Sequence, residues 1–438
     1  MNYFSTRDHK KLRNASLASA VMQGLAPDGG LFMPENIPLL PKSFFSNLRD
    51  HSPEKIASTI ASAFIAEEIP GEALKKIIEE TLNFPIPLQK IDEDIFMLEL
   101  FHGPTMAFKD VGARFMARVM GYFLEKEKKK AKVIVATSGD TGSAVASGFY
   151  NLEGIEVYIL YPSKKISPLQ EKQLTTWGGN IHAIEVEGNF DDCQHIAKQL
   201  LADRDLSKNN LITSANSINI ARLIPQSFYY FFACHQLKES GKAIAISVPS
   251  GNFGNLTAGL LAKRMGLPIR RFIAATNANE VVPKYLHDGI YEPKASLSTI
   301  SNAMDVGSPS NFERMNYLFD ADVQNFRKEI SGYSFSDPQT REAIASAYRN
   351  NNYLLDPHGA VAYLGMKKFM EEQSEKHIGI FLETAHPAKF KETVEDVVGK
   401  HIEIPEKLAA FAQKEKRATL CANNITAAKE LVASKYLS

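Results

Sequence analysis

The sequence predicts an α/β protein with two open, twisted, mainly parallel sheets that carry helices on both faces. From about residue 93, short apolar runs alternate with helical patterns, which is typical of βαβ units. Two of these units also resemble each other, because residues 133–142 and 244–254 each run from a strand through Ser-Gly-x-x-Gly. We therefore expect two α/β domains that face each other across an active-site cleft.

The apolar runs give the expected elements. The predicted buried strands are residues 133–137, 157–161, 181–186, 243–248, 272–276 and 378–382. The predicted helices between them are residues 111–123, 191–200, 221–237, 256–265, 343–349 and 360–371. The expected domains are a helical N-terminal extension (1–92), an α/β domain (93–237), and a second α/β domain with C-terminal helices (238–438).

Helical patterns also occur near both ends of the chain. Residues 16–23 predict a short helix, residues 27–30 a turn, and residues 53–82 amphipathic helices. Residues 425–436 predict a C-terminal helix. The sequence leaves open whether the segment from residue 401 onward docks on the core of the protein or on a neighbouring subunit.

Composition excludes several classes of protein. Lys plus Arg and Asp plus Glu both number 50, and a formal net charge of zero argues against a nucleic-acid binder. The three cysteines have no paired spacing and the histidines are scattered, so neither a disulfide framework nor a metal site is expected. No stretch reaches the roughly 18 apolar residues of a membrane span. We expect a cytoplasmic protein without nucleic-acid, membrane or metal partners.

The two Ser-Gly loops are candidate anion sites. Small residues let backbone N–H groups point at phosphate or carboxylate oxygens, and the dipole of the following helix adds a favourable potential. A tight turn that only joins strand to helix explains either loop equally well when it is taken alone. Neither loop matches the P-loop or the dinucleotide-binding pattern, so a smaller phosphorylated ligand is favoured over a nucleotide.

Lys109 is the candidate reactive residue. It lies at the start of a helix whose apolar positions recur every four residues, and the helix dipole and the neighbouring Phe108 both favour its neutral amine. Lysines are mostly exposed, so an ordinary surface lysine remains the simpler interpretation of the residue alone.

Six motifs, in order, resemble those of the threonine synthase family. They are Tyr3-x-Ser5-Thr6-Arg7, Gln23-Gly-Leu-Ala-Pro-Asp-Gly-Gly-Leu31, His102-Gly-Pro-Thr-x-x-Phe-Lys-Asp110, Thr137-Ser-Gly-Asp-Thr-Gly-Ser143, Pro249-Ser-Gly-Asn-Phe-Gly-Asn255 and Glu383-Thr-Ala-His-Pro-x-Lys-Phe390. The match spans nearly the whole chain and is closest to the longer subclass with an N-terminal extension. Asp8, where the family usually has Gly, is a small departure.

The resemblance implies a pyridoxal 5'-phosphate enzyme of fold type II, like the tryptophan synthase β subunit. Its implied reaction turns O-phospho-L-homoserine and water into L-threonine and phosphate. The family pattern makes Lys109 the Schiff-base lysine and Thr384 the hydroxyl that faces the pyridine nitrogen. The implied cofactor-phosphate loop consists of Gly251, Asn252, Phe253, Gly254 and Asn255. Without the family match, Thr384 reads as a strand-end residue that caps the next helix.

The resemblance also implies substrate contacts. They are Ser138, Asp140 and Thr141 on the first Ser-Gly loop, and Asn216, Asn219 and Arg222 farther along. A carboxylate repels anions, so we expect Asp140 to accept hydrogen bonds from backbone or hydroxyl groups. Asn216 and Asn219 are three residues apart, so we expect them to share a helix face. Arg222 suits a substrate phosphate, although a structural ion pair is nearly as plausible.

Three alternatives remain open. A related phospho-lyase gives 2-oxobutyrate, ammonia and phosphate from the same substrate. The six motifs alone do not distinguish well between this lyase and a threonine synthase. A threonine or serine dehydratase is disfavoured by the N-terminal motifs. A catalytically silent protein that binds a phosphorylated metabolite would keep the two anion loops but would not need Lys109. The sequence does not decide between a monomer and a homodimer.

Overall fold

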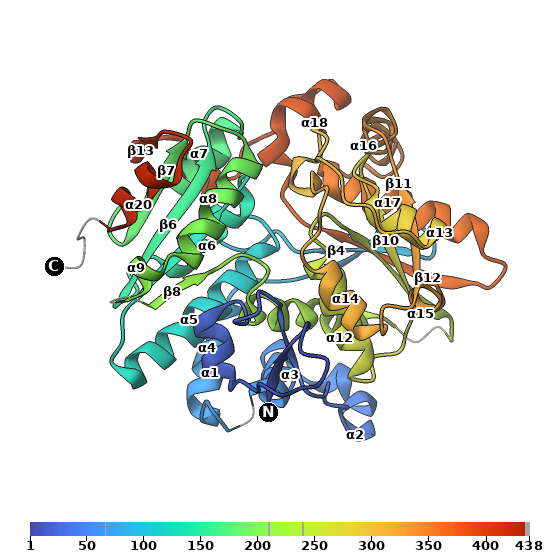
Figure 1. Ribbon diagram of the computed structural model, residues 1–438. Helices are drawn as coiled ribbons and strands as arrows, with labels where there is room; N and C mark the ends of the chain where they lie inside the picture. Colours follow the sequence, from blue (N-terminus) through green and yellow to red (C-terminus); the bar gives the residue numbers. More distant parts are fainter. Residues whose placement is uncertain (66, 209–210, 239–240, 434–438) are drawn as a thin grey trace. The chain divides into compact units, whose positions relative to one another are not determined.

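The computed structural model describes residues 1–65, 67–208, 211–238 and 241–433, which form two compact units (Figure 1). The first unit comprises Met1–Met33, Lys109–Arg222 and Pro405–Ser438, and the second comprises Pro34–Phe108 and Leu223–Ile404. Because the units interleave along the chain, they do not correspond one to one with the three consecutive segments predicted from the sequence. Those domain boundaries stay a prediction, as does the cleft.

The first unit holds a five-stranded sheet, its helices and a small N-terminal sheet. Its elements are β1 (Tyr3–Ser5), α1 (Leu17–Gln23), β2 (Phe32–Pro34), α5 (Lys109–Glu127), β5 (Ala131–Ala136), α6 (Asp140–Phe149), β6 (Ile155–Pro162), α7 (Pro168–Thr175), β7 (Ile181–Val186), α8 (Phe190–Ala202), α9 (Arg204–Ser207), β8 (Leu211–Ser214), α10 (Ile220–Leu223), α19 (Glu406–Ala412), β13 (Ala418–Cys421) and α20 (Ile425–Ala433).

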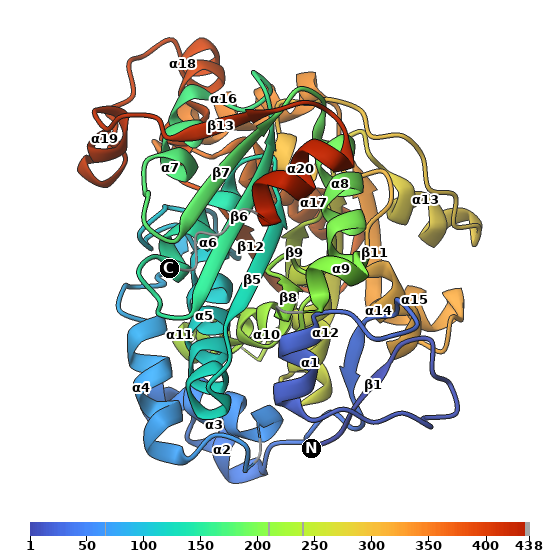
Figure 2. The same ribbon diagram turned by 60° about the vertical axis from the view of Figure 1, so that its left-hand side comes forward.

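The large sheet of the first unit has the order β13-β7-β6-β5-β8, and all four pairings are parallel (Figure 2). Its interior strand β5 is buried along its whole length, which agrees with the apolar run that predicted it. β5 pairs with β6 on one side and with β8 on the other. The loops that follow β5 and β8 therefore begin at the same edge of the sheet, at the point where the strand order reverses.

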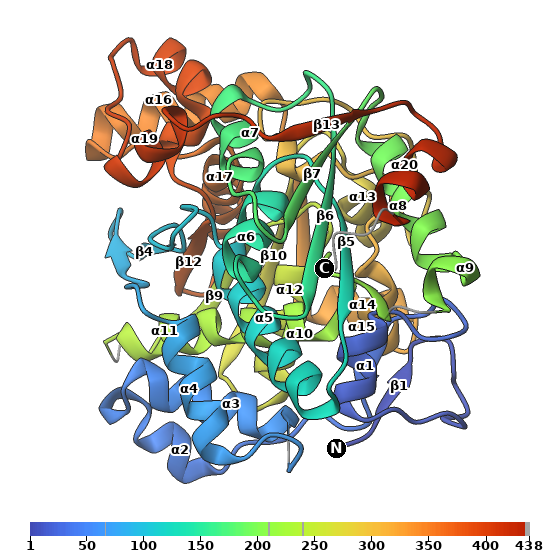
Figure 3. The same ribbon diagram turned by 90° about the vertical axis from the view of Figure 1, so that its left-hand side faces the viewer.

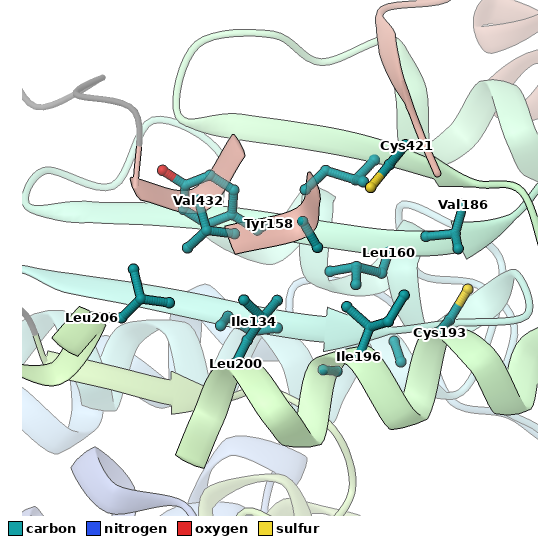
Figure 4. Packing of buried hydrophobic residues seen from close by; sticks show 14 residues of the cluster. Ile134, Tyr158, Leu160, Val186, Cys193, Ile196, Leu200, Leu206, Cys421 and Val432 are labelled. Atoms are coloured by element: carbon teal, nitrogen blue, oxygen red, sulfur yellow. The ribbon is translucent and has the colours of Figure 1, made fainter. Parts of the chain in front are cut away.

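The C-terminal segment docks on this sheet. β13 pairs with β7 as an edge strand, and α20 packs against α8. Figure 4 shows Cys421 and Val432 from this segment in one apolar cluster with Leu160 of β6 and Ile196 of α8. The sequence left open whether this segment docks on the core or on a neighbouring subunit, and in the structure residues 401–433 dock on the core. Residues 434–436 of the predicted helix lie outside the described residues.

The second unit holds a six-stranded sheet and the remaining helices. Its elements are α2 (Lys42–Ser46), η1 (Leu48–Asp50), α3 (Pro53–Ile65), α4 (Gly71–Thr81), β3 (Leu88–Lys90), β4 (Ile95–Glu99), η2 (Ile224–Ser227), α11 (Phe228–Gln236), β9 (Ala243–Pro249), α12 (Gly254–Arg264), β10 (Ile269–Thr276), α13 (Val281–Asp288), η3 (Asn302–Met304), α14 (Phe312–Leu318), α15 (Val323–Glu329), β11 (Ile330–Ser334), α16 (Asp337–Asn351), α17 (Pro357–Glu372), β12 (His377–Glu383), η4 (Pro387–Phe390) and α18 (Lys391–Val398).

This sheet has the order β11-β10-β9-β12-β4-β3, parallel except for the edge pair β3–β4 (Figure 3). Helix α17 packs against β9, β10 and β12. The chain moves outward from β9 to β10 and β11, whereas β12 and β4 lie on the other side of β9. The strand order therefore reverses between β9 and β12, and ligands of open α/β sheets bind at the carboxyl ends of strands at such a point.

All six predicted buried strands are confirmed, and so is the helix–turn pattern of the N-terminal region. The predicted helix over residues 221–237 is wrong in one respect, because it is divided into α10, η2 and α11. Pro225 lies at the division, and proline lacks the N–H that a continuous α-helix would need. The sequence also missed β4, β8, β11 and β13, which are short or only partly apolar. Among the described residues, no helix is long and apolar enough to cross a membrane.

Candidate functional site

The segment that leads to Lys109 is hydrogen-bonded to the segment around Thr384. The amide of Phe108 donates to the carbonyl oxygen of Thr384 at 2.8 Å, and the amide of His386 donates to the carbonyl oxygen of Met106 at 3.1 Å. We call this two-rung antiparallel pairing the lysine ladder. Lys109 follows directly as the first residue of α5 and is half-buried. The two residues predicted to bind opposite parts of the cofactor are therefore attached to one short piece of backbone pairing.

Buried polar groups hold the lysine ladder in place. The ammonium group of Lys389, a residue that is 2% exposed, donates to the carbonyl oxygen of Thr105 at 3.0 Å. The hydroxyl of Tyr229 donates to the carbonyl oxygen of Phe108. Met106 adopts a left-handed φ of 56°, which is uncommon for a residue with a side chain and marks a constrained turn. The two motifs that contain Lys109 and Thr384 thus pack as one structural element.

The loop from Gly251 to Asn255 has the geometry of an anion site. It follows β9 and leads into α12, whose first backbone N–H groups have no acceptor within the helix. Phe253 reaches the helix through a left-handed φ of 59°. A Cβ atom on Gly251 would lie 2.7 Å from Cα of Met304, so the loop passes too close to the neighbouring backbone for any side chain there. Asn252 anchors the loop by accepting a hydrogen bond from the amide of Ser310 at 2.6 Å.

Asn255 supplies a donor to the same loop. Its Oδ1 accepts from the Tyr230 hydroxyl at 2.9 Å, which fixes the orientation of the side-chain amide. Its Nδ2 is buried and has no hydrogen-bond partner among the residues that the structure describes. A buried donor without an acceptor costs about 1–3 kcal/mol. A phosphate oxygen at this helix N-terminus would satisfy it, so the loop fits a phosphorylated ligand.

In the first unit, the loop after β5 is closed by its own side chains. Thr137 Oγ1 accepts from the amides of Gly139 and Gly142 at 3.0 and 2.8 Å, and Gly139 has a φ of 140°. Asp140 is buried and its Oδ1 accepts from the side-chain amide of Gln170 at 3.1 Å. The sequence predicts backbone or hydroxyl donors to Asp140, and it did not indicate the side-chain amide of Gln170 as a donor. Ser138 and Thr141 are half-buried on this loop.

The segment after β8 corrects one prediction. Asn216 and Asn219 do not share a helix face, because both precede α10 and lie in a turn. Asn216 pairs with the backbone of Ala136, accepting from its amide at 3.2 Å and donating to its carbonyl at 2.8 Å. Asn219 donates to the carbonyl of Val21 at 2.9 Å. Both amides support the β5 loop and the N-terminal helix.

Arg222 is 3% exposed in the first unit, and its guanidinium group donates to the carbonyl oxygen of Ala215. A Cβ atom on Gly112 of α5 would lie 3.1 Å from Nε of Arg222, so the glycine makes room for the guanidinium group. The predicted contact of Arg222 with the substrate phosphate stays a prediction.

A cluster of acidic groups lies beneath Thr384 in the second unit. Burial, together with the nearby carboxylate of Asp356, raises the pKa of Glu383 well above its usual range. Glu99 accepts from the hydroxyl of Tyr353 at 2.8 Å and contacts His102 at 2.7 Å. Among the described residues, no group of three or more His, Cys, Asp and Glu could hold a metal ion.

His386 is neutral at physiological pH. Burial and the nearby His102 together lower the pKa of its imidazole to about 4. Its Nδ1 accepts a hydrogen bond from the amide of Ala388 at 3.1 Å, which requires that nitrogen to be unprotonated. A proton on His386 would therefore break a backbone contact next to the lysine ladder.

Comparisons with known proteins agree with this geometry. The family model described as pyridoxal-phosphate dependent enzyme matches residues 80–383, the model for the threonine synthase N terminus matches residues 2–82, and the C-terminal threonine synthase model matches residues 359–432. A threonine synthase of Serratia marcescens and one of Escherichia coli are each 45% identical to the chain, over 94% of both proteins in each comparison. The chain belongs to the threonine synthase family.

Solved structures of the threonine synthase family have the same fold. The crystal structure of threonine synthase from Escherichia coli matches with a TM-score of 0.92 at 42% identity, and it covers 98% of this chain and 99% of its own. A threonine synthase from Brucella melitensis with bound pyridoxal phosphate also matches with a TM-score of 0.92, at 35% identity over 99% and 98% of the two chains. Pyridoxal 5'-phosphate is the cofactor of the family, and the loop at α12 fits its phosphate.

Sequence reasoning missed several residues that support this site. Lys389 lies within the last of the six motifs, but nothing in the sequence indicates that it binds the carbonyl oxygen of Thr105. Asp356 was not singled out from the sequence, and His358 was interpreted as an ordinary turn or core histidine. A usable signal was present, because Asp-Pro-His-Gly is the pattern of a capped helix start with proline at the first position. Their role depends on contacts between distant segments, which the sequence does not show.

We expect Gly251→Ala to weaken cofactor binding. The added methyl group would meet backbone atoms, which cannot rotate away, and overpacking of this kind costs about 1–3 kcal/mol. Titration of the purified variant with pyridoxal 5'-phosphate should show an affinity loss of about tenfold or more. Gly121→Ala on α5 is the matched control, because a Cβ atom there meets nothing within 4 Å. Wild-type affinity in Gly251→Ala would show that the loop does not hold the cofactor.

The neutral state of His386 predicts a pH dependence of stability. Its pKa is near 4 in the folded protein and near 6.5 when unfolded, so the unfolded chain binds more protons between these values. The free energy of unfolding should therefore fall as pH decreases from about 6.5 to 4. In His386→Asn, which retains a side chain able to cap η4, this fall should be smaller. Equal slopes for both proteins in denaturant unfolding across this range would contradict the assignment.

Proposed function

We propose that the chain converts O-phospho-L-homoserine and water into L-threonine and inorganic phosphate with pyridoxal 5'-phosphate as cofactor. In this reaction the Cγ–O bond to phosphate breaks, and water adds a hydroxyl group at Cβ. The observation that carries the proposal is the lysine ladder in a chain that belongs to the threonine synthase family. In the ladder, the segment that leads to Lys109 pairs with the segment around Thr384, and the family resemblance implies cofactor-binding roles for these two residues.

The family resemblance implies the cofactor-binding roles. We propose that Lys109 binds the cofactor covalently, that residues 251–255 hold its phosphate, and that the hydroxyl of Thr384 faces its pyridine nitrogen. A neutral hydroxyl leaves that nitrogen largely unprotonated. When bound, the cofactor stabilises the negative charge left on a substrate carbon after a proton is removed. The raised pKa of Glu383 supports this assignment, because it favours the uncharged carboxyl group, and a charged carboxylate next to Thr384 would favour a protonated ring.

Lys109 is also the proposed proton carrier. Once the substrate amine has displaced it, its amine would take the Cα proton, pass that proton to the bound cofactor, and then take a proton from Cβ so that phosphate can leave from Cγ. The resulting ammonium group can return a proton to Cγ, which is a methyl carbon in L-threonine. A lysine on a rigid helix start returns to the same position after each transfer, because the residues before it are held by the lysine ladder. The half-buried position of Lys109 limits access of bulk water to its amine.

The substrate-binding roles rest on the first unit. We propose that Ser138, Asp140 and Thr141 contact the substrate through the loop at the start of α6. Arg222 is the proposed partner of the substrate phosphate, since a guanidinium group suits phosphate geometry. Asn216 and Asn219 act through the backbone that they hold, because their amides bond to Ala136, Ser214 and Val21.

We further propose that the protein acts in the cytoplasm on this small molecule, as a monomer or a homodimer, without a nucleic-acid or membrane partner. Equal numbers of acidic and basic residues support the absence of a nucleic-acid role. The three cysteines are buried and unpaired with one another, which suits a reducing compartment.

A product assay tests the function. Purified protein, pyridoxal 5'-phosphate and O-phospho-L-homoserine should yield threonine and phosphate in equal amounts, with little 2-oxobutyrate. Phosphate together with 2-oxobutyrate and ammonia would instead identify the related phospho-lyase. Water addition at Cβ is what separates the two, so the ratio of threonine to phosphate decides between them.

Lys109→Ala is the matched control for this assay. The variant should lose turnover, because the other lysine of the recognised motifs, Lys389, is buried and donates to the carbonyl oxygen of Thr105. The variant should still bind the cofactor weakly through the phosphate loop. Turnover at the wild-type rate in Lys109→Ala would refute the role of the lysine while leaving the reaction itself established.

A further inference from the structure

Asp356 connects three parts of the second unit through one carboxyl group. It is fully buried and caps α17, with Oδ1 accepting from the amide of His358 at 2.8 Å and Oδ2 accepting from the amide of Gly359 at 3.3 Å. Oδ2 also accepts from the amide of Ala385 at 3.3 Å, directly after Thr384. A helix cap needs only the first two bonds. The third ties the start of α17 to the segment that carries Thr384.

The same segment is held from its other side. The amide of Asp356 donates to Oε1 of Glu383 at 2.7 Å, so Glu383 and Ala385 both bond to Asp356. Gly359 makes this approach possible, because a Cβ atom there would lie 1.4 Å from Oε2 of Glu383. Thr384 lies between the two tied residues, and its backbone is therefore fixed relative to the first turn of α17.

His358 carries the connection toward the phosphate loop. Its Nδ1 lies 2.5 Å from Oδ1 of Asp356, and its Nε2 accepts from the amide of Ala303 at 3.2 Å. Because Nε2 is an acceptor, the ring hydrogen is on Nδ1 and donates to Asp356. The side chain is 2% exposed, so no bulk water competes for either nitrogen.

The turn that His358 holds is the one that contacts the phosphate loop. A Cβ atom on Gly251 would lie 2.7 Å from Cα of Met304 and 3.1 Å from the carbonyl oxygen of Ala303. The loop backbone thus rests directly on the residues whose amide His358 accepts. The path from Thr384 through Asp356 and His358 to Gly251 consists of hydrogen bonds and backbone contact within one unit.

We propose that Asp356 and His358 are positioning residues that set the location of the cofactor-phosphate loop relative to the segment carrying Thr384. Their role is to hold the backbone of both segments through the hydrogen bonds described above. The proposal rests on the proposed function, since that function assigns the cofactor to these two places. A rigid cofactor requires a fixed distance between the two segments that bind it. A short series of buried hydrogen bonds maintains this distance.

Two substitutions of His358 separate positioning from packing. In His358→Gln the side-chain oxygen can occupy the position of Nε2 and accept from Ala303, whereas in His358→Asn the side chain is too short to reach that amide. We expect His358→Asn to raise the dissociation constant for pyridoxal 5'-phosphate about tenfold, as the loss of one buried hydrogen bond would. His358→Gln should stay within about threefold of wild type.

The phosphorus-31 NMR resonance of the bound cofactor provides a second readout, independent of turnover. It should shift in His358→Asn and return toward the wild-type position in His358→Gln. His377→Asn is the control, because His377 is a buried histidine at the opposite end of β12 and should leave both readouts unchanged. Equal affinity losses in the Asn and Gln variants of His358, or wild-type values in both, would overturn the proposal.

Asp356→Asn extends the test in case His358→Asn does not fold. Asparagine still caps a helix, but it has one acceptor oxygen where Asp356 uses two. We expect its dissociation constant to rise about tenfold, and an unchanged value would overturn the proposal. Failure of the wild-type protein to retain cofactor after borohydride reduction would instead overturn the proposed function.

Discussion

The lysine ladder is the interaction on which the rest of the account depends. A lysine that both binds a cofactor and moves protons must return to one place, and its own side chain has too many rotamers to ensure this. The ladder fixes the backbone just before Lys109 by bonding Phe108 to Thr384 and His386 to Met106. Lys389 and Tyr229 fix the ladder in turn.

The positions of the site loops follow from the strand order of each sheet. In the second unit, β4, β12 and β9 are neighbours, and their carboxyl ends lead to residues 100–109, 384–390 and 249–255. In the first unit, β5 and β8 are neighbours, and the loops after them carry the proposed substrate contacts. Parallel strands bring their carboxyl ends to one edge, so segments distant in sequence meet there without long connections.

Buried polar groups then complete the site. Asp356, Glu383 and His386 lie close to Thr384, and burial raises the pKa of Glu383 and lowers the pKa of His386. Both shifts favour the uncharged form of the side chain. This environment suits the role proposed for the hydroxyl of Thr384.

Much of the fold was predictable because its signals are local. The strand predicted at residues 181–186 has mostly apolar residues, and its bounds agree with β7. Lys109 and residues 251–255 were predictable because they form contiguous motifs. Asn216 and Asn219 were misread as helical, since a spacing of three does not distinguish a helix from a turn. The roles of Asp356, His358 and Lys389 were not predictable, because each depends on a bond to a residue far away in the sequence.

The central claim is that Lys109 carries the cofactor, and peptide mapping after borohydride reduction tests it most directly. The reduced, denatured protein would be digested and analysed by mass spectrometry for the peptide that bears the pyridoxyl phosphate group. We predict one modified residue, Lys109. Modification at another lysine, or none in a protein that turns over its substrate, would contradict it.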